Sequence, residues 1–320
     1  MKFTVCLPAT RPSSVGATIW SIQAQSVTDW ELLVVGQGDD RAIRAAVAAA
    51  AGGDPRIRYL HLKTPGSSRA RTAAIHAARG EILAMTDDDC EARPDWLAVI
   101  GQIFSVEPDV ALVGGSMLAP ASLPVWPASC PSFVATEALH DPARNGPIAP
   151  AGWDWVGGNF AIRRHVAQLV GDFDACLGIG GNFGAAGDTD YKLRMEAMGL
   201  KMRTTPRSIV DHADGWRYGV TAVLRHQRSH ARGNGALAAK LTMMGDPRGR
   251  VWLSMTRREA WSGWWPVRRM LRRVADLRVL FHFSRAYAQC RRDYQVNARG
   301  LLEPRPAMAD RASELERLRA

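Results

Sequence analysis

The sequence predicts an α/β fold in which helices cover both faces of a mostly parallel central sheet. Strand and helix signals alternate through the first hundred residues, and repeated strand–helix units of this length are typical of a parallel sheet. Three consecutive carboxylates follow one expected strand directly, and such sheets bind ligands at the carboxyl ends of their strands. These observations predict the fold class and the region of a ligand site.

The expected strands of the first half are short apolar runs that end close to a proline, a glycine or a carboxylate. They lie at residues 3–7, 31–35, 57–62, 82–86 and 110–113. The expected helices follow a capping residue or are rich in alanine. They run from Ser13 or Ser14 to about 26, over 41–51, from 66–68 to about 79, and from Asp95 to about 104.

The second half is less regular. Residues 119–152 are rich in Pro, Ala and Ser and predict a long ordered loop or lid. Residues 155–162 predict a strand that is entered through glycines, and residues 188–199 predict a helix. On that helix, Tyr191, Met195 and Met198 are expected to form one apolar face.

Composition indicates an ordinary soluble chain of one or two domains. The 320 residues are 47% hydrophobic and 22% charged. Five scattered cysteines without a CxxC pair support neither a disulfide framework nor a zinc knuckle, so a reducing compartment is expected. We expect no signal peptide and, because no apolar stretch reaches about 18 residues, no membrane-spanning helix.

The basic excess belongs to the C-terminal third. Residues 1–215 hold 19 Lys and Arg against 23 Asp and Glu, a net charge of −4. Residues 216–320 hold 22 against 8, a net charge of +14. Such a block favours an anionic partner: a membrane surface, nucleic acid or an acidic substrate.

The segment Glu81–Trp96 carries the strongest chemical signal, Asp87-Asp88-Asp89. Three adjacent carboxylates repel one another unless a positive charge lies among them. At the end of a buried parallel strand, a divalent cation with a phosphate ligand is the favoured partner. A solvated acidic turn is the alternative.

Five segments, in this order, resemble glycosyltransferase family 2 over the N-terminal 240 residues. They are VCLPATRP, WELLVVGQGDD, GSSRARTAAIHAARGEILAMTDDDC, VGGNFAIRR, and FGAAGDTDYKLRMEAMG followed by VDH. The resemblance implies the GT-A fold, a Rossmann-like sheet, and inverting transfer. It divides the chain into a GT-A domain at 1–240, with a nucleotide-binding half at 1–115 and an acceptor-binding half at 116–240, and a basic, mainly helical region at 241–320.

The resemblance also assigns the metal site. Asp87 and Asp89 match the DXD motif, with Asp89 as the expected ligand of Mn²⁺ or Mg²⁺, whose preferred ligands are oxygens. Asp87 is expected at the metal and the nucleotide, and Asp88 near the nucleotide, with plain solvent exposure as the alternative for Asp88. His212 matches a further metal ligand of the family, although a lone histidine can equally be structural.

Residues expected at the nucleotide follow three strands or open a helix. By resemblance Pro8, Thr10 and Arg11 contact the nucleoside, and Arg71 contacts the donor; a solvated helix face is the alternative for Arg71. The family's usual acidic pair is replaced by Gly36 and Gln37. Gln37 can hydrogen-bond a base edge through its amide, or Asp39 can take that role.

Asp188 matches the catalytic base of the family, although Gly187 replaces the usual preceding Glu. Inverting transfer needs one carboxylate to take the proton of the acceptor hydroxyl. Asp188 can instead be only an N-cap, and Asp190 is a rival for either role. Trp153, Asp154 and Trp155 suit a sugar surface, or the core.

Residues 257–294 place Trp261, Trp264 and Trp265 among many arginines. This pattern favours an anionic membrane surface that residues 245–300 contact. A helical subdomain packed on the core is an equal alternative, and nucleic acid is a third and weaker one.

Together these features predict an inverting, metal-dependent glycosyltransferase. It would move a sugar from a nucleotide-sugar donor to a glycan or lipid-linked acceptor in envelope polysaccharide or glycolipid synthesis. The alternatives are a sugar-phosphate nucleotidyltransferase and a non-catalytic nucleotide-sugar-binding or membrane-scaffold protein. We expect a cytoplasmic protein. A further expectation is peripheral attachment to the cytoplasmic face of the inner membrane.

Overall fold

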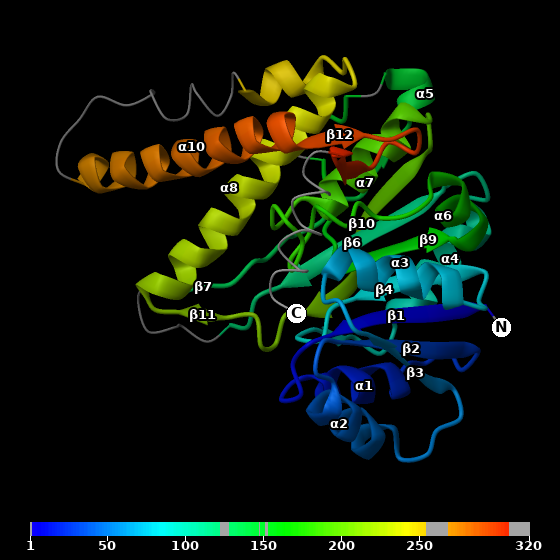
Figure 1. The fold of residues 1–320 in the computed structure, drawn as a ribbon. Coiled ribbons are helices and arrows are strands. Elements are labelled where there is room, and N and C mark those ends of the chain that lie inside the picture. Colours follow the sequence, from blue (N-terminus) through cyan, green and yellow to red (C-terminus); the bar gives the residue numbers. More distant parts are fainter. Residues whose placement is uncertain (1, 122–127, 147, 151–152, 254–267, 307–320) are drawn as a thin grey trace. The chain divides into compact units, whose positions relative to one another are not determined.

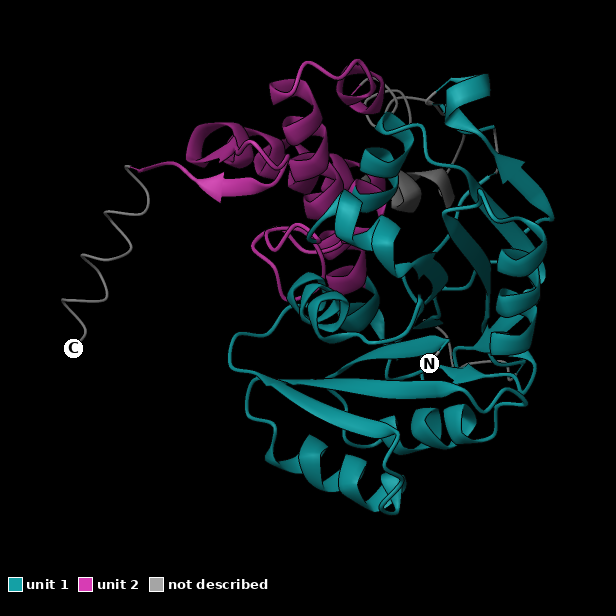
Figure 2. Ribbon diagram, turned by 90° about the vertical axis from the view of Figure 1, so that its right-hand side faces the viewer, with its two compact units in different colours: residues 1–172, 191–223 teal, residues 173–190, 224–320 magenta. Residues whose placement is uncertain are grey.

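A computed structural model describes residues 2–121, 128–146, 148–150, 153–253 and 268–306 (Figure 1). The chain divides into two compact units, which Figure 2 colours separately: residues 1–172 with 191–223, and residues 173–190 with 224–320. These boundaries differ from those at 115 and 240. The predicted domains divide the chain by expected function, into nucleotide-binding, acceptor-binding and basic regions, and this division stays a prediction.

The strands of the first unit lie mainly in one sheet. In chain order they are β1 (Phe3–Ala9), β2 (Trp30–Gln37), β3 (Ile57–Leu62), β4 (Ile82–Thr86), β5 (Glu91–Ala92), β6 (Leu112–Leu118), β7 (Ala128–Ser129), β8 (Ala138–His140), β9 (Asn159–Arg163), β10 (Met202–Asp211) and β11 (Arg217–Tyr218). The second unit contains β12 (Tyr294–Val296) and β13 (Leu302–Pro304).

The helices alternate with the strands in the first half of the chain. They are α1 (Val15–Gln23), α2 (Arg41–Ala51), α3 (Ser67–Ala77), α4 (Trp96–Val106), α5 (Pro142–Asn145), α6 (Arg164–Val170), α7 (Gly187–Ala197), α8 (Val220–Met243) and α10 (Arg268–Asp293). None of the helices within the described residues is both long enough and apolar enough to cross a membrane.

Across the described residues, the main sheet has the order β3-β2-β1-β4-β9-β6-β10-β5, with β8 also paired to β10. The pairs β1–β2, β2–β3, β1–β4 and β6–β10 are parallel. Strand β9 runs antiparallel between β4 and β6. The predicted α/β sheet with parallel strands is therefore present, and β9 is its antiparallel insertion.

Helices cover both faces of this sheet because alternate residues of its buried strands point to opposite sides. Phe3, Val5 and Leu7 of β1 belong to one apolar cluster with residues of α1, α2 and α4. The intervening Thr4 points to the other face, where its hydroxyl accepts a hydrogen bond from the N–H of Gly80 at 2.8 Å, just after α3. The buried strands hold the carboxyl ends of β1, β2 and β4 side by side.

Helix α2 and strands β3 and β4 have the predicted bounds, and the other elements of the first half lie within a few residues of them. Strand β9 begins at Asn159, later than expected. The residues before it form a turn, closed by a hydrogen bond from the N–H of Asn159 to the carbonyl oxygen of Val156 at 3.1 Å. On α7, Tyr191 and Met195 are buried as expected, whereas Met198 lies beyond the helix and is 43% exposed.

In the second unit, α8 and α10 pack closely against each other. A Cβ atom on Gly235 of α8 would lie 2.2 Å from the carbonyl oxygen of Phe283 in α10, so only glycine permits this approach. The hairpin β12–β13 follows α10, and Tyr294 packs its ring 5.0 Å from that of Phe183. The predicted helical character of the C-terminal region is present in its described part; Trp261, Trp264 and Trp265 lie outside the described residues.

Candidate active site

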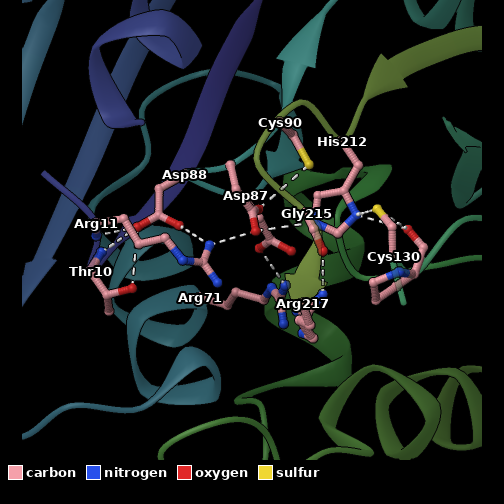
Figure 3. Close-up of polar contacts among 12 residues, drawn as sticks. Thr10, Arg11, Arg71, Asp87, Asp88, Cys90, Cys130, His212, Gly215 and Arg217 are labelled. Carbon is pink, nitrogen blue, oxygen red and sulfur yellow. Dashed lines mark hydrogen bonds and ion pairs between the residues drawn. The ribbon is translucent and has the colours of Figure 1, made fainter. Parts of the chain in front are cut away.

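The acidic triplet follows β4 at the carboxyl end of the sheet, beside the turn that follows β1 (Figure 3). Asp88 is buried and accepts hydrogen bonds from the backbone N–H groups of Thr10 (2.5 Å) and Arg11 (2.7 Å) and from Nη1 of Arg11 (2.9 Å). Burial raises the pKa of Asp88, and the bonds from Thr10 and Arg11 offset part of that rise. Asp88 therefore clamps the turn after β1, and the alternative prediction that Asp88 is exposed to solvent is wrong.

Asp89 shares Arg11 with Asp88 and also meets a histidine from a distant part of the chain. Its Oδ2 lies 3.1 Å from Nε2 of His212, which follows β10, and 2.5 Å from Nη1 of Arg11. Burial alone would raise the pKa of Asp89, but its hydrogen bond and charge interaction with His212 outweigh burial and lower it. The pKa of His212 is raised, because Asp89 outweighs the opposing effect of burial.

The ring of His212 is oriented from its other side. Nδ1 lies 2.8 Å from the carbonyl oxygen of Pro131, which can only accept, so Nδ1 carries a hydrogen. Nε2 then faces Asp89 with a second proton, or with its lone pair when a cation lies between them. A histidine whose second nitrogen donates to a carbonyl is the usual arrangement of a metal ligand.

A metal ion fits this arrangement. Ligand atoms of Asp89, Cys90 and His212 all lie within 4.8 Å of one another, and all three residues are buried. Carboxylate and imidazole suit Mn²⁺ well and Mg²⁺ through the carboxylate. Burial and the charges of Asp87 and Asp89 raise the pKa of the Cys90 thiol well above its ordinary value. Mn²⁺ and Mg²⁺ prefer oxygen ligands to sulfur, so Cys90 suits either ion poorly.

Asp87, the third predicted metal residue, lies beside this group and is paired with Arg71. Nη2 of Arg71 is 2.9 Å from Oδ1 of Asp87 and 3.1 Å from the carbonyl oxygen of Gly157. Arg71 is buried, whereas Asp87 is half-exposed. The alternative of a solvated helix face is therefore wrong for Arg71, and Asp87 keeps an open side for a ligand.

The residues expected to contact the nucleotide differ in their burial and in their hydrogen bonds. Oε1 of buried Gln37 accepts a hydrogen bond from the N–H of Gly66 at 2.7 Å, just before α3. Asp39 is exposed. Pro8 is buried within β1, beside Val35 of β2, and Thr10 and Arg11 continue from it. The contacts of all five predicted residues with a nucleotide stay predictions.

The side chain of Tyr59 lies against Gly36, one of the two residues that replace the family's acidic pair. A Cβ atom on Gly36 would lie 1.8 Å from the hydroxyl oxygen of Tyr59, so the tyrosine occupies the space of a side chain there. The same hydroxyl donates to Oδ2 of Asp40 at 2.8 Å. A side chain at position 36 therefore requires the side chain of Tyr59 to move.

Several residues near the metal group were not predicted. Strand β11 pairs with β7, and the residues after β7 bring Cys130 and Pro131 to His212. Arg217 of β11 donates to the carbonyl oxygen of Gly215 at 2.7 Å, and its charge helps to lower the pKa of Asp89. Cys90 could have been found from the sequence, because it follows the triplet directly. Cys130, Pro131 and Arg217 could not, because strand pairing brings them to the site.

The predicted base and its rival belong to the second unit. Asp188 lies in the first turn of α7, half-buried, and its Oδ1 accepts from the N–H of Thr189 at 2.9 Å. Asp190 is only 2% exposed, and its Oδ1 lies 2.5 Å from Nζ of Lys240. Asp190 is therefore engaged in a buried ion pair, and the role of Asp188 as the base stays a prediction.

The aromatic pair Trp153 and Trp155 is part of the core. Both indoles are buried, and Trp155 packs its ring 4.6 Å from that of Phe160. Asp154 between them is exposed and lies 2.5 Å from Nζ of Lys192. Of the two readings for this segment, the core reading holds for both tryptophans.

The chain matches a known family by its sequence. The model of glycosyl transferase family 2 matches residues 4–169. The chain is 27% identical over 172 residues to the glucosyl-dolichyl phosphate glucuronosyltransferase of Haloferax volcanii, a match that covers 52% of this chain and 53% of that protein. It is 31% identical over 120 residues to the putative colanic acid biosynthesis glycosyl transferase WcaA of Escherichia coli, covering 35% of this chain and 43% of that one. The chain thus spans about half the length of these curated relatives.

Solved structures share the fold. A mannosyltransferase, PcManGT from Pyrobaculum calidifontis in complex with GDP-Man and Mn²⁺, superposes with a TM-score of 0.53 at 16% identity, over 90% of this chain and 86% of that one. S. aureus TarS 1-349 gives a TM-score of 0.53 at 11% identity, over 95% and 96% of the two chains. At these identities the likeness concerns the fold alone, and it confirms the expected fold class.

Proposed function

Because this chain belongs to glycosyl transferase family 2, we propose that it is an inverting, divalent-metal-dependent glycosyltransferase. It moves a sugar from a nucleotide-sugar donor to a glycan or lipid-linked acceptor in envelope polysaccharide or glycolipid synthesis. The observation that carries this proposal is the meeting of Asp89 and His212 at 3.1 Å, with the imidazole oriented by Pro131.

In this proposal the first unit holds the donor. Asp89 and His212 would hold the cation, with the open side of Asp87 next to them. A bound Mn²⁺ or Mg²⁺ would supply positive charge to the departing nucleoside diphosphate. Arg71, already held by Asp87, provides guanidinium donors at the same place, and the clamp of Asp88 on Thr10 and Arg11 keeps the nucleoside turn in position.

The acceptor is activated by Asp188. Its carboxylate takes the proton of the acceptor hydroxyl while that oxygen attacks the anomeric carbon and the diphosphate leaves. One displacement of this kind inverts the anomeric configuration. Asp188 sits in the first turn of α7.

The relatives support the substrate classes. One is named for a dolichyl phosphate-linked sugar and one for colanic acid biosynthesis. Similar structures were solved with GDP-Man and Mn²⁺, and with UDP-GlcNAc. We carry over from them a nucleotide-sugar donor, a divalent cation and a glycan or lipid-linked acceptor.

We also propose that residues 245–300 contact an anionic membrane surface, so that a cytoplasmic protein works at the cytoplasmic face of the membrane. In α10, Leu277 and Phe281 are 55% and 57% exposed, one turn apart. His282 lies among four arginines of α8 and α10, and burial together with their charges lowers its pKa; they are Arg228, Arg278, Arg232 and Arg285. Apolar side chains beside clustered positive charge suit an anionic bilayer.

A donor-turnover assay tests the enzymatic proposal. Purified protein with Mn²⁺ and a panel of UDP- and GDP-sugars should release nucleoside diphosphate slowly, with water as the acceptor. Release of pyrophosphate from a nucleoside triphosphate and a sugar phosphate would instead indicate a nucleotidyltransferase. Donor binding without turnover, even with lipid extract added, would indicate a binding protein.

Vesicle flotation tests the membrane proposal. The protein should float with vesicles that contain phosphatidylglycerol and not with pure phosphatidylcholine. Replacing the four clustered arginines by glutamine should abolish flotation, while Arg207→Gln, which changes an exposed arginine of the first unit, should not. Equal flotation of the fourfold variant would contradict the proposal.

A further inference from the structure

A lysine lies fully inside the second unit between two carboxylates. Lys240 of α8 is 1% exposed, and its Nζ lies 2.8 Å from Oδ2 of Asp174 and 2.5 Å from Oδ1 of Asp190. Asp174 and Asp190 are 0% and 2% exposed. Charges taken out of water at this depth are costly unless each is paired. The network is therefore a fixed feature of the unit.

Asp174 extends the network to the end of the described chain. Its Oδ2 also accepts from the N–H of Leu302 in β13 at 2.9 Å, and its Oδ1 accepts from the N–H of Cys176 at 3.0 Å. Lys240 thus connects three segments: the loop at Asp174, the first turn of α7 and, through Asp174, the C-terminal hairpin. The three segments therefore hold one another in place.

Helix α8 also touches the backbone just before α7. A Cβ atom on Gly233 would lie 1.6 Å from the carbonyl oxygen of Ala185, so the helix and this loop are in direct contact at a glycine. Four residues earlier on α8, the hydroxyl of Ser229 accepts from the N–H of Ala185 at 3.3 Å. Ser229, Gly233 and Lys240 share one face of α8, because their spacing of four and seven residues follows the helical repeat.

The contacted loop is strained. Ala186 has a φ angle of 96°, in the left-handed region that a side chain disfavours. A strained backbone of this kind persists only where the surrounding structure holds it. Its carbonyl oxygen accepts from the N–H of Asp190 at 2.9 Å, so the strained residue leads directly into the first turn of α7.

We propose that Lys240 is a positioning residue for Asp188, acting through Asp190. Residues two apart on a helix point roughly 200° away from each other. Lys240 draws Asp190 into the interior, and the same turn then presents Asp188 on its outer side. Ser229 and Gly233 support the strained loop from the same helix face. The inference rests on the proposed function, because it assumes that Asp188 is the base.

The variant Lys240→Met tests it by steady-state donor hydrolysis with Mn²⁺ and a UDP- or GDP-sugar that the wild type turns over. We expect kcat to fall by about 10- to 100-fold, the scale of a misplacement near 1 Å, while KM for the donor stays within twofold. Lys240→Arg should recover part of kcat, because it keeps the charge. Arg305→Gln, which removes the hydrogen bond from Nε of Arg305 to the carbonyl oxygen of Tyr294 in the same unit, should leave both constants unchanged.

Asp190→Asn keeps the inference testable if Lys240→Met does not fold. It retains an acceptor for Lys240, and Asp174 still pairs with the amine. We expect a smaller loss of kcat, again with an unchanged donor KM. Unchanged kcat in folded Lys240→Met or in Asp190→Asn would overturn the inference, and so would a parallel rise in donor KM.

Asp188→Asn, assayed beside them, separates this inference from the proposed function. Loss of turnover in Asp188→Asn together with full turnover in Lys240→Met overturns the role of Lys240 and leaves the proposed base standing. Full turnover in Asp188→Asn overturns both the base and the inference. Loss of kcat in both variants at an unchanged donor KM supports both.

Discussion

Nε2 of His212 lies 3.1 Å from Oδ2 of Asp89, although the two residues are separated by more than a hundred positions in the chain. The imidazole is held from behind by the carbonyl oxygen of Pro131 at 2.8 Å. Both side chains are buried, and Asp89 is the main cause that raises the pKa of His212.

His212→Gln should weaken Mn²⁺ binding by about tenfold or more, because altering a metal's ligand environment has effects of at least this size. The measurement is a Mn²⁺ titration followed by electron paramagnetic resonance. His165→Gln, which changes an exposed histidine of α6, should bind Mn²⁺ as the wild type does. Wild-type affinity in His212→Gln would exclude this histidine from the metal site.

Asp88→Asn should destabilise the protein by about 1.5–3 kcal/mol, the value of hydrogen bonds to a charged group. The amide presents one oxygen and one NH₂ group to donors from Thr10 and Arg11 that now meet two carboxylate oxygens. Urea denaturation measures the change. The exposed Asp95→Asn is the control, and equal stability of the two variants would argue against the clamp.

Glu31 should make stability depend on pH. It is buried in β2 and accepts from Thr4 (2.7 Å), Arg58 (2.7 Å) and the N–H of Arg79 (2.8 Å). Burial alone would raise its pKa, but these bonds outweigh burial and lower the pKa below its ordinary value of 4.5. Its stabilisation is therefore complete above pH 4.5 and is lost as pH falls through the lowered pKa.

Glu31→Gln should accordingly be less stable than the wild type by about 1.5–3 kcal/mol at pH 7, and the gap should narrow below pH 4.5. Urea unfolding at a series of pH values measures it. Exposed Glu91→Gln should show neither effect. A gap that widens on acidification would contradict the assigned direction of the pKa shift.

Gly36→Ala should destabilise the protein by about 1–3 kcal/mol, as overpacking does, because the new methyl group meets the hydroxyl of Tyr59. Tyr59→Val added to it should recover part of the loss, a non-additivity that a double-mutant cycle measures. Gly16→Ala, whose methyl group would lie 3.8 Å from Cβ of Ala50, is the control. Additive effects of positions 36 and 59 would refute their contact.

Much of the Rossmann-like half was predictable because its signals are local. The Ala-rich run of α2 and the apolar run of β4 each contain their own start and stop, and both have the predicted bounds. The direction of β9 was not predictable, because the period of apolar residues is the same in parallel and antiparallel strands. Its pairing with both β4 and β6 arises from tertiary packing.

The site was predictable as far as motifs reach. The triplet, Arg71 and His212 were named from matching segments, and the structure brings Asp89 to His212 and Asp87 to Arg71. The clamp of Asp88 and the carbonyl of Pro131 were not, because each depends on a backbone group brought there by the fold. The motifs did not separate Asp188 from Asp190. The buried ion pair that distinguishes Asp190 involves Lys240 of α8, which is fifty positions away in the sequence.

Pro131 has its own consequence. It follows β7, whose ladder with β11 consists of two residue pairs, Arg217 with Ser129 and Tyr218 with Ala128. So short a ribbon is only marginally stable on its own, and such segments open well before a protein unfolds globally. Two residues after Pro131, however, Phe133 forms an antiparallel bridge with Met117 of β6 in the main sheet. Opening of the ribbon on warming would therefore remove one of two attachments of the carbonyl group that orients the imidazole, before the main sheet itself opens.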